Sequence, residues 1–132
     1  MKAAVWYGQK DVRVVDVPEP LTPQPGWVKV EVAWCGICGS DLHEYLAGPI
    51  FIPVNEPHPL TGATAPLILG HEFSGKIVEV GEGVKDFKVG DRVAPDACQV
   101  CWECYWCKRM EYSACEKLAF TGLANDGAFA RY

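Results

Sequence analysis

The sequence lacks any long hydrophobic run. No apolar stretch approaches the roughly 20 residues that a helix needs to cross a bilayer. The stretch MKAAVWYGQKDVRVV also lacks the apolar segment and small-residue cleavage site of a secretory signal. We therefore expect a cytoplasmic protein without a membrane partner.

An excess of positive charge is also missing. The chain has 12 Lys and Arg residues against 17 Asp and Glu residues, a formal net charge of −5. Contacts with phosphates need clustered Lys and Arg side chains, so we expect no nucleic-acid partner. The chain contains no internal repeat and no low-complexity tract, and 132 residues correspond to about one domain.

Helical periodicity is scarce as well. Short Val-rich segments with near-alternating polarity, bounded by Pro or Gly, predict β-strands. Prolines exclude regular helix between Val17 and Trp27, and five more make residues 48–66 a long loop that could border a site. Only SDLHEYLAG and the Cys-rich stretch show possible helical turns, so a mainly β barrel or sandwich is expected. The expected strands cover residues 3–7, 12–17, 27–34, 75–81 and 91–96.

Cysteine, by contrast, is abundant: the chain has seven. A reducing cytosol and an odd number argue against complete disulfide pairing, which favours metal binding. The spacing C-x2-C-x2-C-x7-C can place four thiolates around one tetrahedral ion, and a closed shell of this kind is typical of structural zinc. The candidate ligands are Cys101, Cys104, Cys107 and Cys115.

Two other interpretations of this stretch are an iron–sulfur cluster and a redox dithiol. Neither is favoured, because the stretch has no ferredoxin spacing and no thioredoxin-like strand and helix around it. Cys98 leaves open which four cysteines bind the metal. Cys98, Cys101 and Cys104 form an equivalent C-x2-C-x2-C triplet, which Cys115 follows after ten residues instead of seven.

A second group of possible metal ligands lies apart from the first. Cys38 stands in CGICGSDLH, and His71 with Glu72 in LILGHEFSG, each at the end of an apolar segment and beside glycine. Three such ligands leave an open position for a catalytic zinc. The alternative is that Cys38 is a small buried residue and His71 a hydrogen-bonded loop residue. The residues that follow Cys38 favour the catalytic interpretation, because they could relay a proton and orient the ligands. They are Ser40, Asp41 and His43.

The stretch GHEFSGKIVEVGEGV, Gly70 to Val84, resembles the signature G-H-E-x2-G-x5-G-x2-V of zinc-containing alcohol dehydrogenases in the medium-chain dehydrogenase/reductase superfamily. CGICGSDLHEY, a GDRV segment and the four-cysteine stretch follow the order expected of that family. Within it, FIPVNEPHPLTGATAPLILGHEFSG looks like the (R,R)-2,3-butanediol dehydrogenase branch, with sorbitol-type polyol dehydrogenases as near neighbours.

The resemblance implies a role for each candidate residue. Cys38 and His71 match catalytic-zinc ligands, and Glu72 matches a glutamate that approaches or binds the metal in some members. Ser40 matches the residue that passes the alcohol proton, and His43 a relay histidine. Asp41 matches a carboxylate behind the ligands. The register that begins at Cys101 matches the structural zinc, which leaves Cys98 and Cys35 as non-ligand thiols.

The resemblance also implies a fold and an activity. The fold is a GroES-like, partly open β-barrel with a projecting four-cysteine zinc lobe. The activity is hydride transfer between a small secondary alcohol or diol and NAD or NADP, with one structural and one catalytic zinc, in a homo-oligomer. Because no G-x-G-x-x-G follows a strand, we expect residues 1–132 to be the catalytic domain of a longer enzyme, a fragment without the dinucleotide-binding domain and inactive alone.

Some positions depart from the family pattern. Met110 stands where the lobe usually has glycine, which bears on the conformation of that loop. A different class of function also fits the dense cysteines: a non-enzymatic zinc-binding β-barrel module that binds a protein partner. Such a module needs one tightly held metal and has no use for the Cys38 and His71 group. Assembly in the manner of a co-chaperonin is weaker, because fold alone does not carry function.

Overall fold

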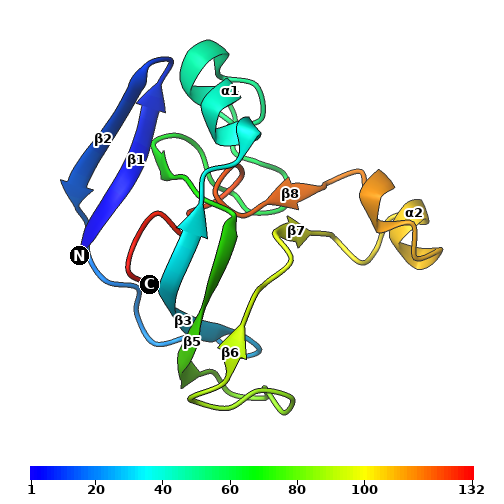
Figure 1. The fold of residues 1–132 in the computed structure, drawn as a ribbon. Coiled ribbons are helices and arrows are strands. Elements are labelled where there is room, and N and C mark those ends of the chain that lie inside the picture. Colours follow the sequence, from blue (N-terminus) through cyan, green and yellow to red (C-terminus); the bar gives the residue numbers. More distant parts are fainter.

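The computed structural model describes residues 1–132, which form three small antiparallel sheets and few helices (Figure 1). In the first sheet, β1 (Lys2–Gly8) pairs with β2 (Asp11–Asp16) on one side and with β4 (Leu67–Ile68) on the other. The β1 and β2 pair is a hairpin. β4 returns to β1 after the long proline-rich loop, residues 48–66, which contains no helix or strand, as expected.

The second sheet contains β3 (Val28–Gly36), β5 (Glu72–Val80) and β6 (Arg92–Val93). β3 and β5 are the two longest strands and pair along their whole length, from Val28 opposite Val80 to Gly36 opposite Glu72. The expected strands are confirmed except at the last: only Arg92–Val93 of residues 91–96 pair. Pro95 lacks the N–H that a longer ladder would need.

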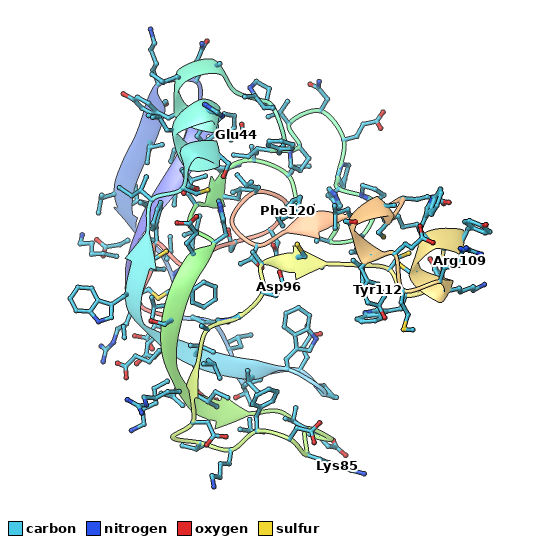
Figure 2. All side chains as sticks on the ribbon, turned by 45° about the vertical axis from the view of Figure 1, so that its right-hand side comes forward. Glu44, Lys85, Asp96, Arg109, Tyr112 and Phe120 are labelled. Carbon is cyan, nitrogen blue, oxygen red and sulfur yellow. The ribbon has the colours of Figure 1, made fainter.

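The third sheet is the base of a projecting lobe. β7 (Cys98–Gln99) pairs with β8 (Ala119–Phe120), and between them lie α2 (Tyr105–Lys108) and the single-turn η1 (Tyr112–Ala114). Figure 2 shows Arg109 toward the far end of this lobe, well away from the barrel strands, with Tyr112 between it and the base of the lobe. The mainly β, partly open barrel with a projecting cysteine lobe is thereby confirmed.

The barrel core is small. Its centre consists of five buried side chains, each of which stabilises the fold by about 2 kcal/mol through apolar burial. Between the two larger sheets runs an open groove, lined by apolar side chains such as Val5, Val30 and Phe73. No helix of the structure combines the length and the apolarity needed to cross a membrane. The five central core residues are Trp6, Ile52, Leu67, Leu69 and Leu123.

Helix α1 (Gly39–Ala47) follows β3 and is tied to the core by its buried side. Trp6 Nε1 donates a hydrogen bond to the backbone oxygen of Glu44 at 3.1 Å, which joins the helix to β1. Asp41 and Glu44, three residues apart on one helical face, are both buried. The helix therefore presents two acidic side chains to the interior, and both form hydrogen bonds with backbone N–H groups.

Candidate metal centres

The four cysteines of the lobe converge on one point. The Sγ atoms of Cys101, Cys104, Cys107 and Cys115 all lie within 4.8 Å of one another. The Sγ of Cys101 is 3.9 Å from that of Cys107 and 3.6 Å from that of Cys115. Four thiolates at about 2.3 Å from a tetrahedral zinc have sulfur atoms about 3.8 Å apart, so the group fits that ion. Cys98 is exposed and lies outside the group.

Backbone N–H groups favour the thiolate form of some of these sulfurs. The N–H of Cys107 and that of Glu116 lower the pKa of Cys104 to about 6. Cys104 is also the N-cap of α2, where its sulfur accepts from the first turn at 3.5 Å. Burial and neighbouring thiols act in the opposite sense on Cys107 and raise its pKa to about 12. A cation is what allows all four sulfurs to be thiolates together.

These pKa shifts predict a steep pH dependence of metal binding in the lobe. At neutral pH Cys104 is already a thiolate, because its lowered pKa lies below 7, whereas Cys107 must give up a proton to bind. Each proton displaced weakens binding tenfold per pH unit, so affinity for Zn²⁺ should fall at least about 100-fold from pH 7 to pH 5. Competition with a chelating dye at both pH values measures this change, and an affinity independent of pH would contradict it.

Met110, where the family resemblance leads us to expect glycine, has a left-handed backbone conformation with φ of 61°. Its side chain is exposed, so the fold keeps this conformation without packing against it. The residue that ends the turn after α2 therefore has the left-handed backbone conformation that glycine favours. Methionine in place of the expected glycine has not removed the turn after α2.

A second group of ligand atoms lies between β3 and β5. Atoms of Cys38, His71 and Glu72 lie within 4.8 Å of one another. The register between β3 and β5 brings these three residues together, because Gly36 at the end of β3 pairs with Glu72 at the start of β5. Cys38 follows two residues after the end of β3 as the N-cap of α1, and His71 directly precedes β5. One thiolate, one imidazole and one carboxylate form a set that suits zinc and leaves a position open.

Two residues of the first turn of α1 hold this group in place. The Oγ of Ser40 is 3.0 Å from Nε2 of His71. Asp41 is 3 % exposed; its Oδ2 accepts from the N–H of Cys38 at 2.9 Å, and its Oδ1 lies 3.6 Å from Nδ1 of His71. Both Oδ1 of Asp41 and Nδ1 of His71 are buried without a hydrogen-bond partner. A proton on Nδ1 would face Asp41, and Nε2, which contacts the Ser40 hydroxyl, would then be the ring nitrogen able to accept from that hydroxyl or to bind a metal.

His43 does not join this cluster. Its side chain lies on the exposed side of α1, and it makes no hydrogen bond with Ser40. The structure thus brings together Cys38, Ser40, Asp41 and His71 with Glu72, and leaves the expected relay histidine at the surface. Its role in proton transfer stays a prediction.

Residues 24–132 match the family described as the alcohol dehydrogenase GroES-like domain. The chain belongs to this family. The GroES-like domain is 55 % identical to (R,R)-butanediol dehydrogenase of Bacillus subtilis, over all of this chain and 37 % of that protein. It is 40 % identical to (R,R)-butanediol dehydrogenase of Saccharomyces cerevisiae, over 98 % of this chain and 38 % of the relative.

Solved structures agree with the sequence comparison. The GroES-like domain superposes on 2R,3R-butanediol dehydrogenase from Bacillus subtilis with a TM-score of 0.86 at 54 % identity, covering 97 % of this chain and 35 % of the other. Galactitol-1-phosphate dehydrogenase from Escherichia coli gives a TM-score of 0.82 at 37 % identity, covering 99 % and 34 %. The chain thus spans little more than a third of the relatives that it matches.

Sequence reasoning missed two acidic residues of this GroES-like domain that support its site. Glu44 could have been found, because it lies three residues after Asp41 and so shares its helical face. Asp126 left no local signal, because its carboxylate accepts from the N–H of Ile68, 58 residues earlier in the chain.

Proposed function

We propose that this chain is the catalytic domain of a zinc-dependent alcohol dehydrogenase that oxidises a small secondary alcohol or diol, with NAD or NADP as hydride acceptor. The observation that carries the proposal is the convergence of Cys38, His71 and Glu72 beside the hydroxyl of Ser40. A binding module has no need of this open ligand set. The share of the relatives' length that the chain spans supports a longer enzyme, with the dinucleotide bound by another domain.

The substrate that the relatives favour is 2,3-butanediol, with acetoin as the ketone of the reverse reaction. Relatives from Bacillus subtilis, Neisseria gonorrhoeae and Saccharomyces cerevisiae are named (R,R)-butanediol dehydrogenase. A further yeast relative is named a probable diacetyl reductase that forms (R)-acetoin. Sorbitol dehydrogenase of Halalkalibacterium halodurans is 42 % identical, so a longer polyol is the second candidate.

We assign metal binding, proton transfer and orientation of the ligands to different residues of the chain. Cys38, His71 and Glu72 would hold the catalytic zinc, which when bound supplies a Lewis acid that lowers the pKa of an alcohol. Ser40, in contact with His71, would accept the alcohol proton and release its own toward solvent. The family resemblance adds His43, on the exposed side of α1, as the group that would take up that proton. Asp41 holds the backbone of Cys38 through a hydrogen bond, and its other carboxylate oxygen, 3.6 Å from Nδ1 of His71, would orient that ring.

The lobe would hold the structural zinc. Its four sulfurs form a closed set with no open position, which suits a stabilising ion and not a reacting one. We further propose that the longer enzyme is a homo-oligomer, as the family resemblance implies.

The zinc content of the purified chain tests the two-centre arrangement. We expect about two zinc ions per chain by elemental analysis, because two separate ligand sets are present. Cys38→Ala should lose one ion and Cys104→Ala the other. Cys98→Ala is the matched control, since Cys98 lies outside both groups and should keep both ions.

The alternative function makes a different prediction in the same experiment. A non-enzymatic zinc module would hold one ion, lost in Cys104→Ala and retained in Cys38→Ala. That outcome would remove the support for a catalytic centre in this chain.

A further inference from the structure

The three residues that precede His71 lie between two other segments of backbone. The N–H of Leu69 donates to the oxygen of Ala4 in β1 at 3.2 Å. The N–H of Ala4 donates to the oxygen of Phe129 at 2.9 Å, and the N–H of Phe129 donates to the oxygen of Leu69 at 2.8 Å. These three bonds form a closed ring that joins the strand before His71, β1 and a segment near residue 129.

The segment Asp126–Phe129 forms hydrogen bonds with most of the backbone N–H and C=O groups of residues 68–70. Oδ1 of Asp126 accepts from the N–H of Ile68 at 2.9 Å. The N–H of Gly127 donates to the oxygen of Ile68, and that of Ala128 to the oxygen of Gly70, both at 2.8 Å. His71 therefore follows a piece of chain whose position is set by residues more than fifty positions away in sequence.

The segment Asp126–Phe129 packs so closely against residues 69 and 70 that only glycine fits at position 127. A Cβ on Gly127 would lie 2.3 Å from the oxygen of Gly70, 2.5 Å from the Cα of Gly122 and 2.7 Å from the oxygen of Leu69. These are backbone atoms, which move only if their segments of chain move with them. Gly70 itself has φ of 98°, so the backbone enters His71 from a conformation that glycine favours.

We propose that the Asp126–Phe129 segment positions His71 in the candidate catalytic metal centre, with Gly127 and Asp126 as positioning residues. Neither residue belongs to the ligand group. They act through the backbone of residues 68–70, which they hold at a fixed distance from β1. The inference rests on the proposed function, because it concerns how the proposed metal ligands are aligned.

Cobalt binding to the full chain tests this proposal, since Co²⁺ replaces Zn²⁺ and its visible absorption separates a four-thiolate centre from a mixed sulfur, nitrogen and oxygen centre. Gly127→Ala should weaken Co²⁺ binding at the Cys38 and His71 centre about 10- to 100-fold, the range found for residues that orient metal ligands. Binding in the lobe should not change, which also reports that the variant is folded. Gly8→Ala is the control, because a Cβ there meets nothing within 4 Å.

A second pair of variants covers the possibility that Gly127→Ala fails to fold. Asp126→Ala should weaken the same centre about 3- to 10-fold, since it removes one hydrogen bond to Ile68. Asp126→Asn should restore the affinity, because its amide oxygen can accept the same bond. Equal weakening of both centres, or no change at the Cys38 and His71 centre, would overturn the proposal.

The proposed function can fail separately. If the unaltered chain binds a single Co²⁺, in the lobe, the two-centre function is wrong while the positioning of His71 is still decided by NMR. The cross-peaks between the His71 ring and Ser40, whose Oγ lies 3.0 Å from Nε2, should then be lost in Asp126→Ala and kept in Asp126→Asn. Cross-peaks that persist in Asp126→Ala would overturn the inference.

Discussion

Replacing Cys38 with alanine is expected to reduce dehydrogenase activity at least about 1000-fold. The activity is measured in a hybrid enzyme in which this chain replaces the matching third of the Bacillus subtilis (R,R)-butanediol dehydrogenase, to which it is 55 % identical. The reason is that a Lewis-acid metal contributes several kcal/mol to the transition state, and about 1.4 kcal/mol corresponds to tenfold in rate. Without Cys38, His71 and Glu72 remain as two ligands of three.

The same hybrid offers a close control. Cys35 lies three residues earlier in β3, opposite Phe73, and belongs to neither ligand group. Cys35→Ala should therefore keep at least about half of the activity and both zinc ions. The assay follows NADH or NADPH formed from (R,R)-butanediol. If Cys38→Ala retains the activity of the parent hybrid, the assignment of this residue to the catalytic centre is wrong.

The features that were predictable from sequence are those encoded over a short span. The four lobe cysteines occur within fifteen positions, and a loop of that length brings them together whatever the rest of the chain does. The strands also follow from local alternation of polarity. The residue types around Cys38 and His71 already indicated a metal centre, but their convergence depends on the register between β3 and β5, which local patterns do not give.

The features that could not be predicted depend on distant partners or on which way a helix faces. Asp126 and Ile68 are 58 residues apart, and no local sequence pattern around either residue predicts that they form a hydrogen bond. His43 lies on the exposed side of α1, because the face of that helix that enters the core is set by Asp41 and Glu44; its role as a relay histidine stays a prediction. An acidic pair on the buried face runs against hydrophobic patterning. Its backbone partners, together with the nearby ring of His71, explain it.

Loss of the Glu44 side chain is expected to destabilise the fold strongly. This side chain is fully buried, and it has no Lys, Arg or His partner. Its carboxylate instead accepts from the N–H groups of Ile50, Phe51 and Ile52, which begin the proline-rich loop. Glu44 thereby fastens the end of α1 to that loop. The helix whose first turn carries Cys38, Ser40 and Asp41 depends on this attachment.

Glu44→Ala should lower the free energy of unfolding by about 3 kcal/mol, which for a chain of this size corresponds to about 10 °C in Tm. The loss is smaller than three full hydrogen bonds, because Ile50 and Phe51 are half exposed and water can reach their N–H groups, whereas Ile52 is buried. Urea unfolding of the zinc-saturated protein measures the change. Glu56→Ala, an exposed change in the same loop, should stay within about 0.5 kcal/mol of the parent. A Glu44→Ala protein as stable as Glu56→Ala would show that the loop does not need its buried carboxylate, and that α1 is held by Trp6 and the core alone.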